Sequence, residues 1–140
     1  MAVVVDASAI GAIMLGEPDG ATLRAHLEGQ TLLAPALIDL ELANVALKKA
    51  KKRPDQLPQI FLSLQAALAL PISRMTVPGA EAFALAAETG LTAYDAGYLW
   101  LARSRDAELV TLDSELARFA PRSRRNVWTL DARLRDCSSP

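Results

Sequence analysis

The chain begins with an uninterrupted apolar run, Ala2–Val5, that stops at Asp6. Consecutive β-branched valines indicate a strand buried on both faces, as in a parallel sheet covered by helices. Small residues follow Asp6, which is typical of a helix start, so Asp6 is predicted to lie at the carboxyl end of the strand. In open α/β sheets that end forms the crevice where ligands bind. Asp6 is also a good N-cap residue, and its position alone leaves both roles open.

Helical and extended segments alternate along the rest of the chain, with Gly and Pro between them. Further strands are predicted at 31–34, 72–77, 108–112 and 126–130, and helices at 9–15, 21–28, 36–52, 57–70, 79–89 and 92–105, with a short one reaching 119. The alternation is typical of an α/β fold of three layers, α/β/α, with a short central parallel sheet covered by helices on both faces. At 140 residues, the chain is expected to form a single domain, 1–140.

Composition excludes several classes of protein. Apolar residues make up 51% of the chain, too many for a disordered protein. The net charge is −1, so any nucleic acid would have to be bound by a local basic patch. The longest apolar stretch, 57–72, is too short to span a bilayer, and the N-terminus lacks the basic leader of a signal peptide. Cys137 is the one cysteine, so no disulfide can form within the chain, which suits a reducing compartment. Together these features lead us to expect a cytoplasmic protein with no membrane association.

Glu41 lies in a predicted helix where no basic residue stands three or four positions away. Its helical face is shared with Leu37 and Leu40, so we expect Glu41 to point inward. Asp39 is turned by about 200° around the helix axis and is predicted to face solvent. A buried carboxylate needs a proton, a partner or a metal ion. Glu41 is therefore the unusual acid of this helix, and Asp39 is an ordinary surface residue.

Two further acids have the same ambiguity as Asp6. Asp95 follows Thr92 at the spacing of a capping box, in a helix that is otherwise strongly apolar. Asp113 ends the predicted strand 108–112 and could cap the short helix that follows. Glu115 differs, because Arg118 stands three residues on and predicts a surface ion pair. We therefore leave Glu115 outside any site.

Taken together, these acids predict one site. Asp6 and Asp113 end buried strands at the same edge of the sheet, and Glu41 and Asp95 lie on helices that begin near that edge. Clustered carboxylates raise one another's pKa unless a cation is present. Hard divalent cations such as Mg²⁺ and Mn²⁺ take oxygen ligands of this kind. The chemistry that uses such a site is metal-assisted hydrolysis of phosphodiesters.

The ordered set of motifs resembles that of the PIN-domain ribonucleases, and specifically the VapC-type toxins of bacterial toxin–antitoxin pairs. The matching segments are Val-Val-Asp6-Ala-Ser8-Ala, Pro35…Glu41-Leu-Ala-Asn44-Val-Ala-Leu, Thr92-Ala-Tyr-Asp95-Ala-Gly-Tyr and Leu-Val-Thr111-Leu-Asp113. The resemblance implies a three-layer α/β/α fold and cleavage of RNA that depends on Mg²⁺ or Mn²⁺. It also implies inhibition by a small cognate antitoxin protein, and commonly a homodimer.

Carried over by motif, the resemblance implies a set of site residues. The catalytic, metal-binding acids would be Asp6, Glu41, Asp95 and Asp113, supported by Ser8, Asn44 and Thr111. Asp131 follows the last predicted strand and is a further candidate. The basic run 48–53 could contact RNA through Lys48 and Lys52, although cations at a helix C-terminus are also expected to be solvated partners of the helix dipole.

Other functions fit the sequence less well. A catalytically inactive PIN-like protein-interaction module is the main alternative, and the presence of all four acids argues against it. A phosphatase or receiver domain would need a second acid near Asp6, or an acid at the end of 72–77, and neither is present. His26 has no nucleophile turn near it. Leu42 and Leu62 lie off the main apolar stripes of their helices, which suits a partner, a dimer interface, or core beneath a neighbouring element.

Overall fold

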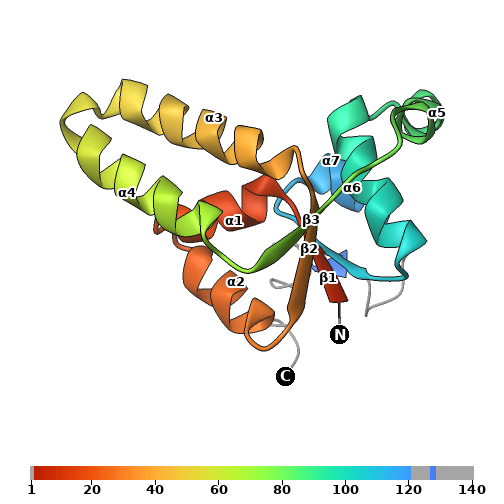
Figure 1. Ribbon diagram of the computed structural model, residues 1–140, viewed down its shortest axis with the longest axis horizontal. Helices are drawn as coiled ribbons and strands as arrows, with labels where there is room; N and C mark the ends of the chain where they lie inside the picture. Colours follow the sequence, from red (N-terminus) through yellow and green to blue (C-terminus); the bar gives the residue numbers. More distant parts are fainter. Residues whose placement is uncertain (1, 121–126, 129–140) are drawn as a thin grey trace.

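A computed structural model describes residues 2–120 and 127–128 of the chain. A parallel sheet of five strands, in the order β3-β2-β1-β4-β5, forms its centre (Figure 1). The strands are β1 (Ala2–Val5), β2 (Thr31–Pro35), β3 (Ile72–Met75), β4 (Glu108–Val110) and β5 (Val127–Trp128). The first strand of the sequence is thus the middle strand of the sheet, which explains its unbroken run of valines: Val3, Val4 and Val5 are each at most 1% exposed.

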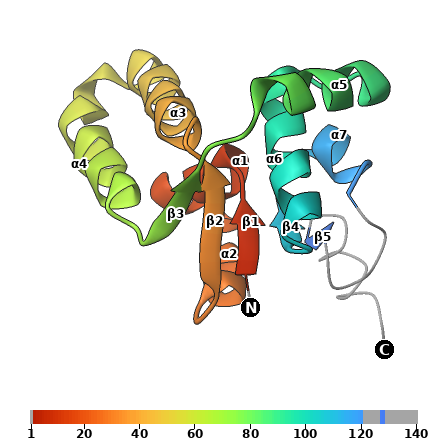
Figure 2. The same cartoon turned by 45° about the vertical axis from the view of Figure 1, so that its right-hand side comes forward.

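Helices cover both faces of the sheet, as Figure 2 shows. On one side lie α1 (Ala7–Met14), α2 (Gly20–Leu27), α3 (Ile38–Lys52) and α4 (Leu57–Leu68), with the short 3₁₀ turn η1 (Pro54–Gln56) between the last two. On the other side lie α5 (Gly79–Thr89), α6 (Ala93–Ser104) and α7 (Ser114–Ala117). The predicted three-layer α/β/α arrangement is confirmed.

The buried face of α3 differs from the predicted one. Its buried residues are Ile38, Leu42, Ala46 and Ala50, a row with a spacing of four. Leu40, predicted to point inward, is 73% exposed, whereas Leu42 is fully buried. Apolar residues occupy both faces of this helix, so periodicity could not decide between them, and packing against α1 and α4 selected the row that begins at Ile38. Glu41 lies beside that row and is half-buried.

Helix α4 exposes several large apolar side chains. Helices α3 and α4 form a long hairpin that extends away from the sheet (Figure 1). Leu57 and Phe61 are each 54% exposed because this part of α4 lies near the tip of the hairpin. Of the two residues off the apolar stripes, Leu62 is 64% exposed, which excludes core for it, whereas Leu42 is core.

Several predictions fall on the C-terminal segment. The last predicted strand, 126–130, is described at β5 alone, and Asp131 and the basic loop 121–125 lie outside the described residues. A single domain over 1–140 stays a prediction. Among the described helices, none combines the length and the apolar character needed to cross a bilayer.

Candidate active site

A cleft of about 260 Å³ lies at the carboxyl ends of β1 and β4, between α3 and α6. All four predicted acids line it, and they come from four separate parts of the chain. The lining residues are Asp6, Ala7, Ser8, Glu41, Asn44, Val45, Lys48, Asp95, Tyr98 and Asp113. Parallel strands place their carboxyl ends at one edge, which is why residues so far apart in sequence meet here.

Asp6 both caps a helix and lines the cleft. Its Oδ1 accepts hydrogen bonds from the Ala9 amide at 3.0 Å and from Ser8 Oγ at 2.7 Å, and its Oδ2 accepts one from Thr111 Oγ1 at 2.5 Å. The side chain is nevertheless buried, and this burial raises the pKa of Asp6 to about 6 against the lowering effect of these hydrogen bonds, with the charge of Asp113 adding to the rise. The two roles that the sequence left open therefore coexist.

Two hydroxyls connect Asp6 to the loop that carries Asp113. Ser8 Oγ accepts a hydrogen bond from the Leu112 amide at 2.9 Å, and Thr111 Oγ1 accepts one from the Asp113 amide at 2.9 Å. Each hydroxyl thus donates to one oxygen of Asp6 and accepts from the β4–α7 loop. Asp113 in turn caps α7 by accepting from the Glu115 amide at 2.9 Å. Ser8 and Thr111 therefore lie where they can orient Asp6, and their supporting role in a reaction stays a prediction.

Glu41 is held by a tyrosine that the sequence analysis did not include. Tyr98 Oη donates a hydrogen bond to Glu41 Oε1 at 3.0 Å, and the Tyr98 side chain is 1% exposed. Burial raises the pKa of Glu41, the Tyr98 bond opposes the rise, and the charges of Asp95 and Asp6 add to it. The signal was present in the sequence, because Tyr98 follows Asp95 by three residues and therefore shares its helical face.

Asp95 lies in the first turn of α6, where Thr92 Oγ1 accepts a hydrogen bond from the Asp95 amide at 3.1 Å. Its pKa is raised by burial first and then by the charge of Asp113, while the contact with Thr92 opposes the rise. Glu115 also raises the pKa of Asp95, although it is exposed and does not line the cleft. Glu115, excluded on the basis of a predicted surface pair, is therefore part of the electrostatic surroundings of the site.

The remaining predicted residues are divided between the cleft and its surroundings. Asn44 and Lys48 are exposed and line the cleft, whereas Lys52, one turn further along α3, is not among the lining residues.

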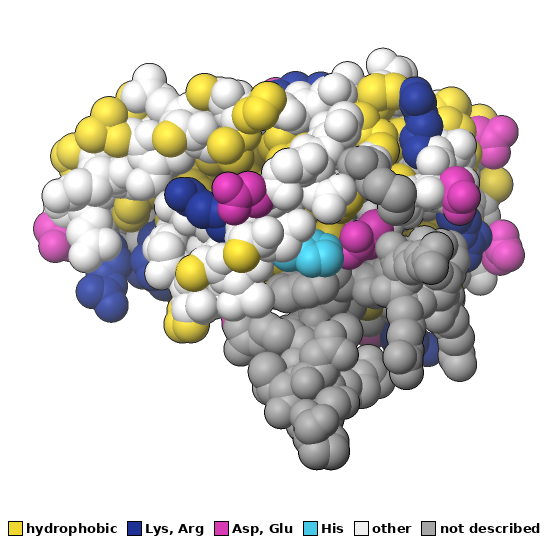
Figure 3. Space-filling model, turned by 90° about the horizontal axis from the view of Figure 1, so that it is seen from below, with side chains coloured by type: hydrophobic (Ala, Val, Ile, Leu, Met, Phe, Trp, Pro, Cys, Tyr) yellow, Lys and Arg dark blue, Asp and Glu magenta, His cyan; other side chains and the backbone are white. Residues whose placement is uncertain are grey.

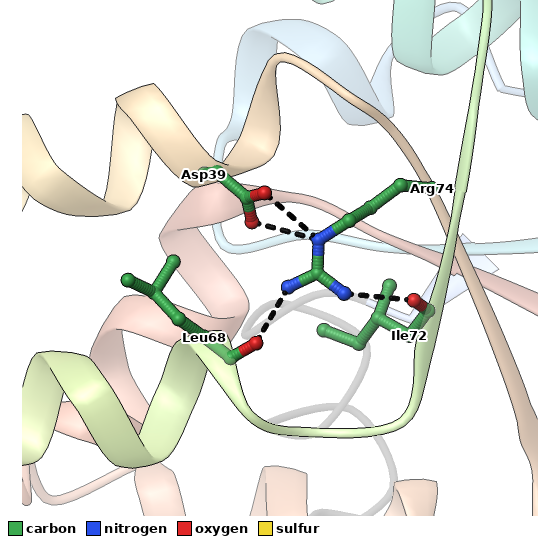
Figure 4. A network of polar contacts seen from close by, with 4 residues as sticks. All are labelled: Asp39, Leu68, Ile72 and Arg74. Carbon is green, nitrogen blue, oxygen red and sulfur yellow. Dashed lines mark hydrogen bonds and ion pairs between the residues drawn. The ribbon is translucent and has the colours of Figure 1, made fainter.

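Asp39 lies outside the cleft as predicted, but its carboxylate is bound by Arg74 (Figure 4) instead of being simply solvated. His26 pairs with Glu108 at the amino end of β4, with Nε2 2.6 Å from Oε1, and Figure 3 shows the histidine on this opposite side of the molecule.

The donor set of the cleft suits a hard divalent cation, since it consists of carboxylates with hydroxyl and amide groups beside them. For three of the acids, the rise in pKa includes the negative charge of another acid in the cleft, a repulsion that a cation would relieve. Across residues 2–120 and 127–128, however, no three acidic, histidine or cysteine side chains are arranged so that they already hold a metal ion. The carboxylates surround the cleft, and closer approach of their side chains would be needed for shared ligation.

Replacing Tyr98 with phenylalanine tests how Glu41 is held. Phenylalanine keeps the buried ring and removes the hydroxyl that donates to Glu41 Oε1, so we expect little loss of folding beyond about 1 kcal/mol. We expect the affinity for Mn²⁺, measured by calorimetry, to fall about tenfold because the carboxylate is no longer oriented. Tyr94, which is 62% exposed, offers a matched control as Tyr94→Phe. Equal affinities in the two variants would show that the Tyr98 hydroxyl does not orient Glu41.

The fold and the cleft together define a class of protein. A family model described as PIN domain matches residues 3–121, and the chain belongs to that family. It is similar to Ribonuclease VapC3 of Pyrobaculum aerophilum, with 36% identity over 86% of this chain and 96% of that protein. It is also similar to Ribonuclease VapC12 of Mycobacterium tuberculosis, with 29% identity over 82% of this chain and 89% of that protein.

A solved structure extends the comparison to the fold. The crystal structure of PAE2754 from Pyrobaculum aerophilum matches with a TM-score of 0.71 and 27% identity, and the match covers 100% of each chain. The resemblance to VapC-type PIN-domain ribonucleases that the motifs indicated is thereby confirmed, together with the three-layer fold.

Proposed function

We propose that this chain is an endoribonuclease that depends on Mg²⁺ or Mn²⁺ and acts as the toxin of a toxin–antitoxin pair. One observation carries the proposal: Asp6, Glu41, Asp95 and Asp113 line a single cleft. Burial raises the pKa values of the first three, and the charge of at least one other acid of the cleft adds to each rise. The printed names of the relatives, which are ribonucleases, support RNA as the substrate.

The residues of the cleft have distinct tasks in this proposal. The four carboxylates would hold the cation, with Asp6 oriented by Ser8 and Thr111 and Glu41 oriented by Tyr98. A divalent cation bound there would offset the charge on the phosphate oxygens and make a water molecule easier to deprotonate. A carboxylate in the cleft with a raised pKa is suited to accept that proton.

Positive charge for the substrate backbone is available beside the acids. Lys48 lines the cleft on the same helix as Glu41, and we propose that it contacts an RNA phosphate there. Lys52 continues the basic surface along α3 and is proposed as a second, more peripheral contact. Asn44, between them and Glu41, can offer amide donors and acceptors to the substrate or to the carboxylate.

Protein partners are also part of the proposal. The name VapC of the relatives supports a cognate antitoxin, and the hairpin of α3 and α4 exposes apolar side chains that a protein partner could cover. These are Leu47, Leu57, Phe61 and Leu62, each at least 50% exposed. We also propose a homodimer, which the mass measured in solution by light scattering would test against the 15.0 kDa of one chain.

Cleavage of RNA with and without the cation tests the proposed function. We expect single-stranded RNA to be cut with Mn²⁺ or Mg²⁺ and to remain intact with excess chelator. Asp95→Asn should lower the rate at least about 100-fold because it removes a ligand charge. The exposed Asp55, in η1 far from the cleft, gives the control Asp55→Asn, which should cleave at the wild-type rate.

Cleavage that persists in chelator, or an Asp95→Asn variant as active as wild type, would contradict the proposed mechanism. A chain that never cleaves RNA under any metal condition but still binds a protein partner would favour the inactive interaction module instead.

A further inference from the structure

The α3–α4 hairpin is rooted at one edge of the sheet. It leaves the sheet after β2 and returns at β3, the strand that pairs with β2. Helix α3 has Leu37 at its N-cap position, so no side-chain cap fixes its first turn. One wall of the cleft, formed by Glu41, Asn44 and Lys48, belongs to this helix. The position of that wall therefore depends on how the ends of the hairpin are attached to the sheet.

A single arginine, Arg74 of β3, binds both ends of the hairpin (Figure 4). Its Nε donates to both carboxylate oxygens of Asp39, at 2.8 and 2.9 Å, in the first turn of α3. Its Nη2 donates at 3.0 Å to the carbonyl of Leu68, the last residue of α4, and its Nη1 donates at 2.9 Å to the carbonyl of Ile72. Three elements, α3, α4 and β3, thus meet at one guanidinium.

The chemistry of this contact favours a geometric role over a stabilising one. The Arg74 and Asp39 side chains are 25% and 42% exposed, and ion pairs so close to water contribute little to stability. A planar guanidinium with five donors, in contrast, fixes the directions of several partners at once. Lysine has the charge without that fixed fork, so it could not bind Asp39 and both carbonyls in the same way.

We infer that Arg74, through Asp39, is a positioning residue for Glu41. Asp39 stands two residues before Glu41 in the same turn of α3, so fixing Asp39 against β3 fixes the backbone from which Glu41 extends. Tyr98 then holds the Glu41 carboxylate from the other side of the cleft. This inference rests on the proposed function, because the position of Glu41 matters for holding the cation. Small displacements of a binding carboxylate have large consequences for a metal site.

Binding of Mn²⁺ to the folded protein, followed by calorimetry, tests the inference without measuring cleavage. We expect Arg74→Met, which keeps the aliphatic stem, to weaken binding about tenfold, and Arg74→Lys and Asp39→Asn to weaken it less. The exposed Arg24 on α2, away from the cleft, provides the matched control Arg24→Met, which should bind as wild type does. Thermal unfolding of each variant is measured in parallel.

A background that lacks the Glu41 carboxylate separates positioning from general stability. If Arg74 acts through Glu41, Arg74→Met should have no further effect on Mn²⁺ affinity in a Glu41→Gln protein. An equal loss in both backgrounds, or a lower melting temperature with unchanged affinity, would overturn the inference and leave Arg74 a purely structural residue.

Hydrogen exchange distinguishes failure of the inference from failure of the proposed function. If the wild type binds no Mn²⁺, the proposed metal dependence is wrong. The amide exchange of residues 41–48 then decides whether Arg74 fixes the α3 wall of the cleft. Faster exchange there in Arg74→Met than in Arg24→Met would support Arg74 as the residue that fixes this wall of the cleft. The same exchange rates in both variants would overturn that role.

Discussion

Asparagine in place of Asp6 is expected to abolish RNA cleavage and, at neutral pH, to make the metal-free protein more stable. Asp6 is 5% exposed, and burial raises its pKa from the ordinary value of 3.8 to about 6. At pH 7 the folded protein therefore keeps a carboxylate ionised in a place that disfavours its charge. A difference of about two pKa units corresponds to about 3 kcal/mol of lost stability. Asparagine removes that unfavourable charge. The same charge is one that the proposed cation requires of its ligands.

The gain in stability should be smaller than this limit. In asparagine an NH₂ group replaces Oδ2 and cannot accept the hydrogen bond that Thr111 donates to Asp6 Oδ2, so part of the gain is lost. We expect the free energy of unfolding of Asp6→Asn to exceed that of wild type by about 1–2 kcal/mol at pH 7 in chelator. Cleavage with Mn²⁺ should fall at least about 100-fold.

The dependence on pH gives the sign of the effect. Between pH 4 and 6, the folded protein retains a proton on Asp6 that the unfolded chain has released, so acidification stabilises the folded state. The contribution is fully present below about pH 3.8 and is lost as the pH rises through about 6. Urea unfolding from pH 4 to 7.5 measures it as the difference between wild type and Asp6→Asn, which cancels the titration of other groups. Because wild type regains about 2 kcal/mol or more between pH 7 and pH 4, the difference should reverse its sign, with wild type the more stable protein at pH 4.

Opposite changes in stability and activity are the mark of a residue that is strained for function. A residue that served only to cap α1 would behave differently, because its replacement would weaken the fold and leave cleavage to other groups. A lower urea midpoint for Asp6→Asn than for wild type at pH 7 would contradict our inference that burial disfavours the ionised Asp6 carboxylate.

Most of the fold follows from short-range patterns. The valines of β1 and the Pro and Gly residues between elements mark the layers because burial and backbone breaks act within a few residues. Asp6 and Asp113 stand out for the same reason, since each directly follows a segment whose sequence predicts a strand. Capping and cleft lining do not exclude each other, because the Asp6 carboxylate has one oxygen for a helix amide and another for Thr111.

Long-range pairs account for what the sequence did not predict. Arg74 and Asp39 are 35 residues apart, and Tyr98 and Glu41 are 57 apart, so no local spacing could join them. The buried face of α3 was predicted wrongly for a similar reason. Apolar residues lie on two faces of this helix, and the contacts with α1 and α4 decide which face is buried. Expecting Leu40 inside and Asp39 alone in solvent was the consequence of that ambiguity.

Valine in place of Thr111 is expected to destabilise the protein by about 2–6 kcal/mol and to weaken Mn²⁺ binding. Thr111 is 0% exposed, and its hydroxyl donates to Asp6 Oδ2 and accepts from the Asp113 amide. Valine has nearly the same shape, so no cavity forms, and the loss comes from two buried groups left without a partner, at about 1–3 kcal/mol each. Urea unfolding and calorimetry measure the two effects.

Serine at the same position separates the hydroxyl from the methyl group. Thr111→Ser keeps both hydrogen bonds and loses one buried methyl, so we expect a loss of about 1 kcal/mol and Mn²⁺ affinity close to wild type. If Thr111→Ser and Thr111→Val weakened Mn²⁺ binding equally, the packing of the methyl group and not the hydroxyl would support the cleft.

The Asp6 and Thr111 variants also test each other, because they act on one hydrogen bond from its two ends. The hydrogen bond from Thr111 lowers the pKa of Asp6, so Thr111→Val should raise that pKa further and reduce the fraction of ionised carboxylate available to a cation near pH 7. Mn²⁺ binding by Thr111→Val should then recover partly as the pH is raised, which a purely structural defect would not produce. In an Asp6→Asn background the carboxylate is already absent, so Thr111→Val should cost less stability than it does in wild type. Additive losses in that double variant would mean that Thr111 supports the β4–α7 loop independently of Asp6.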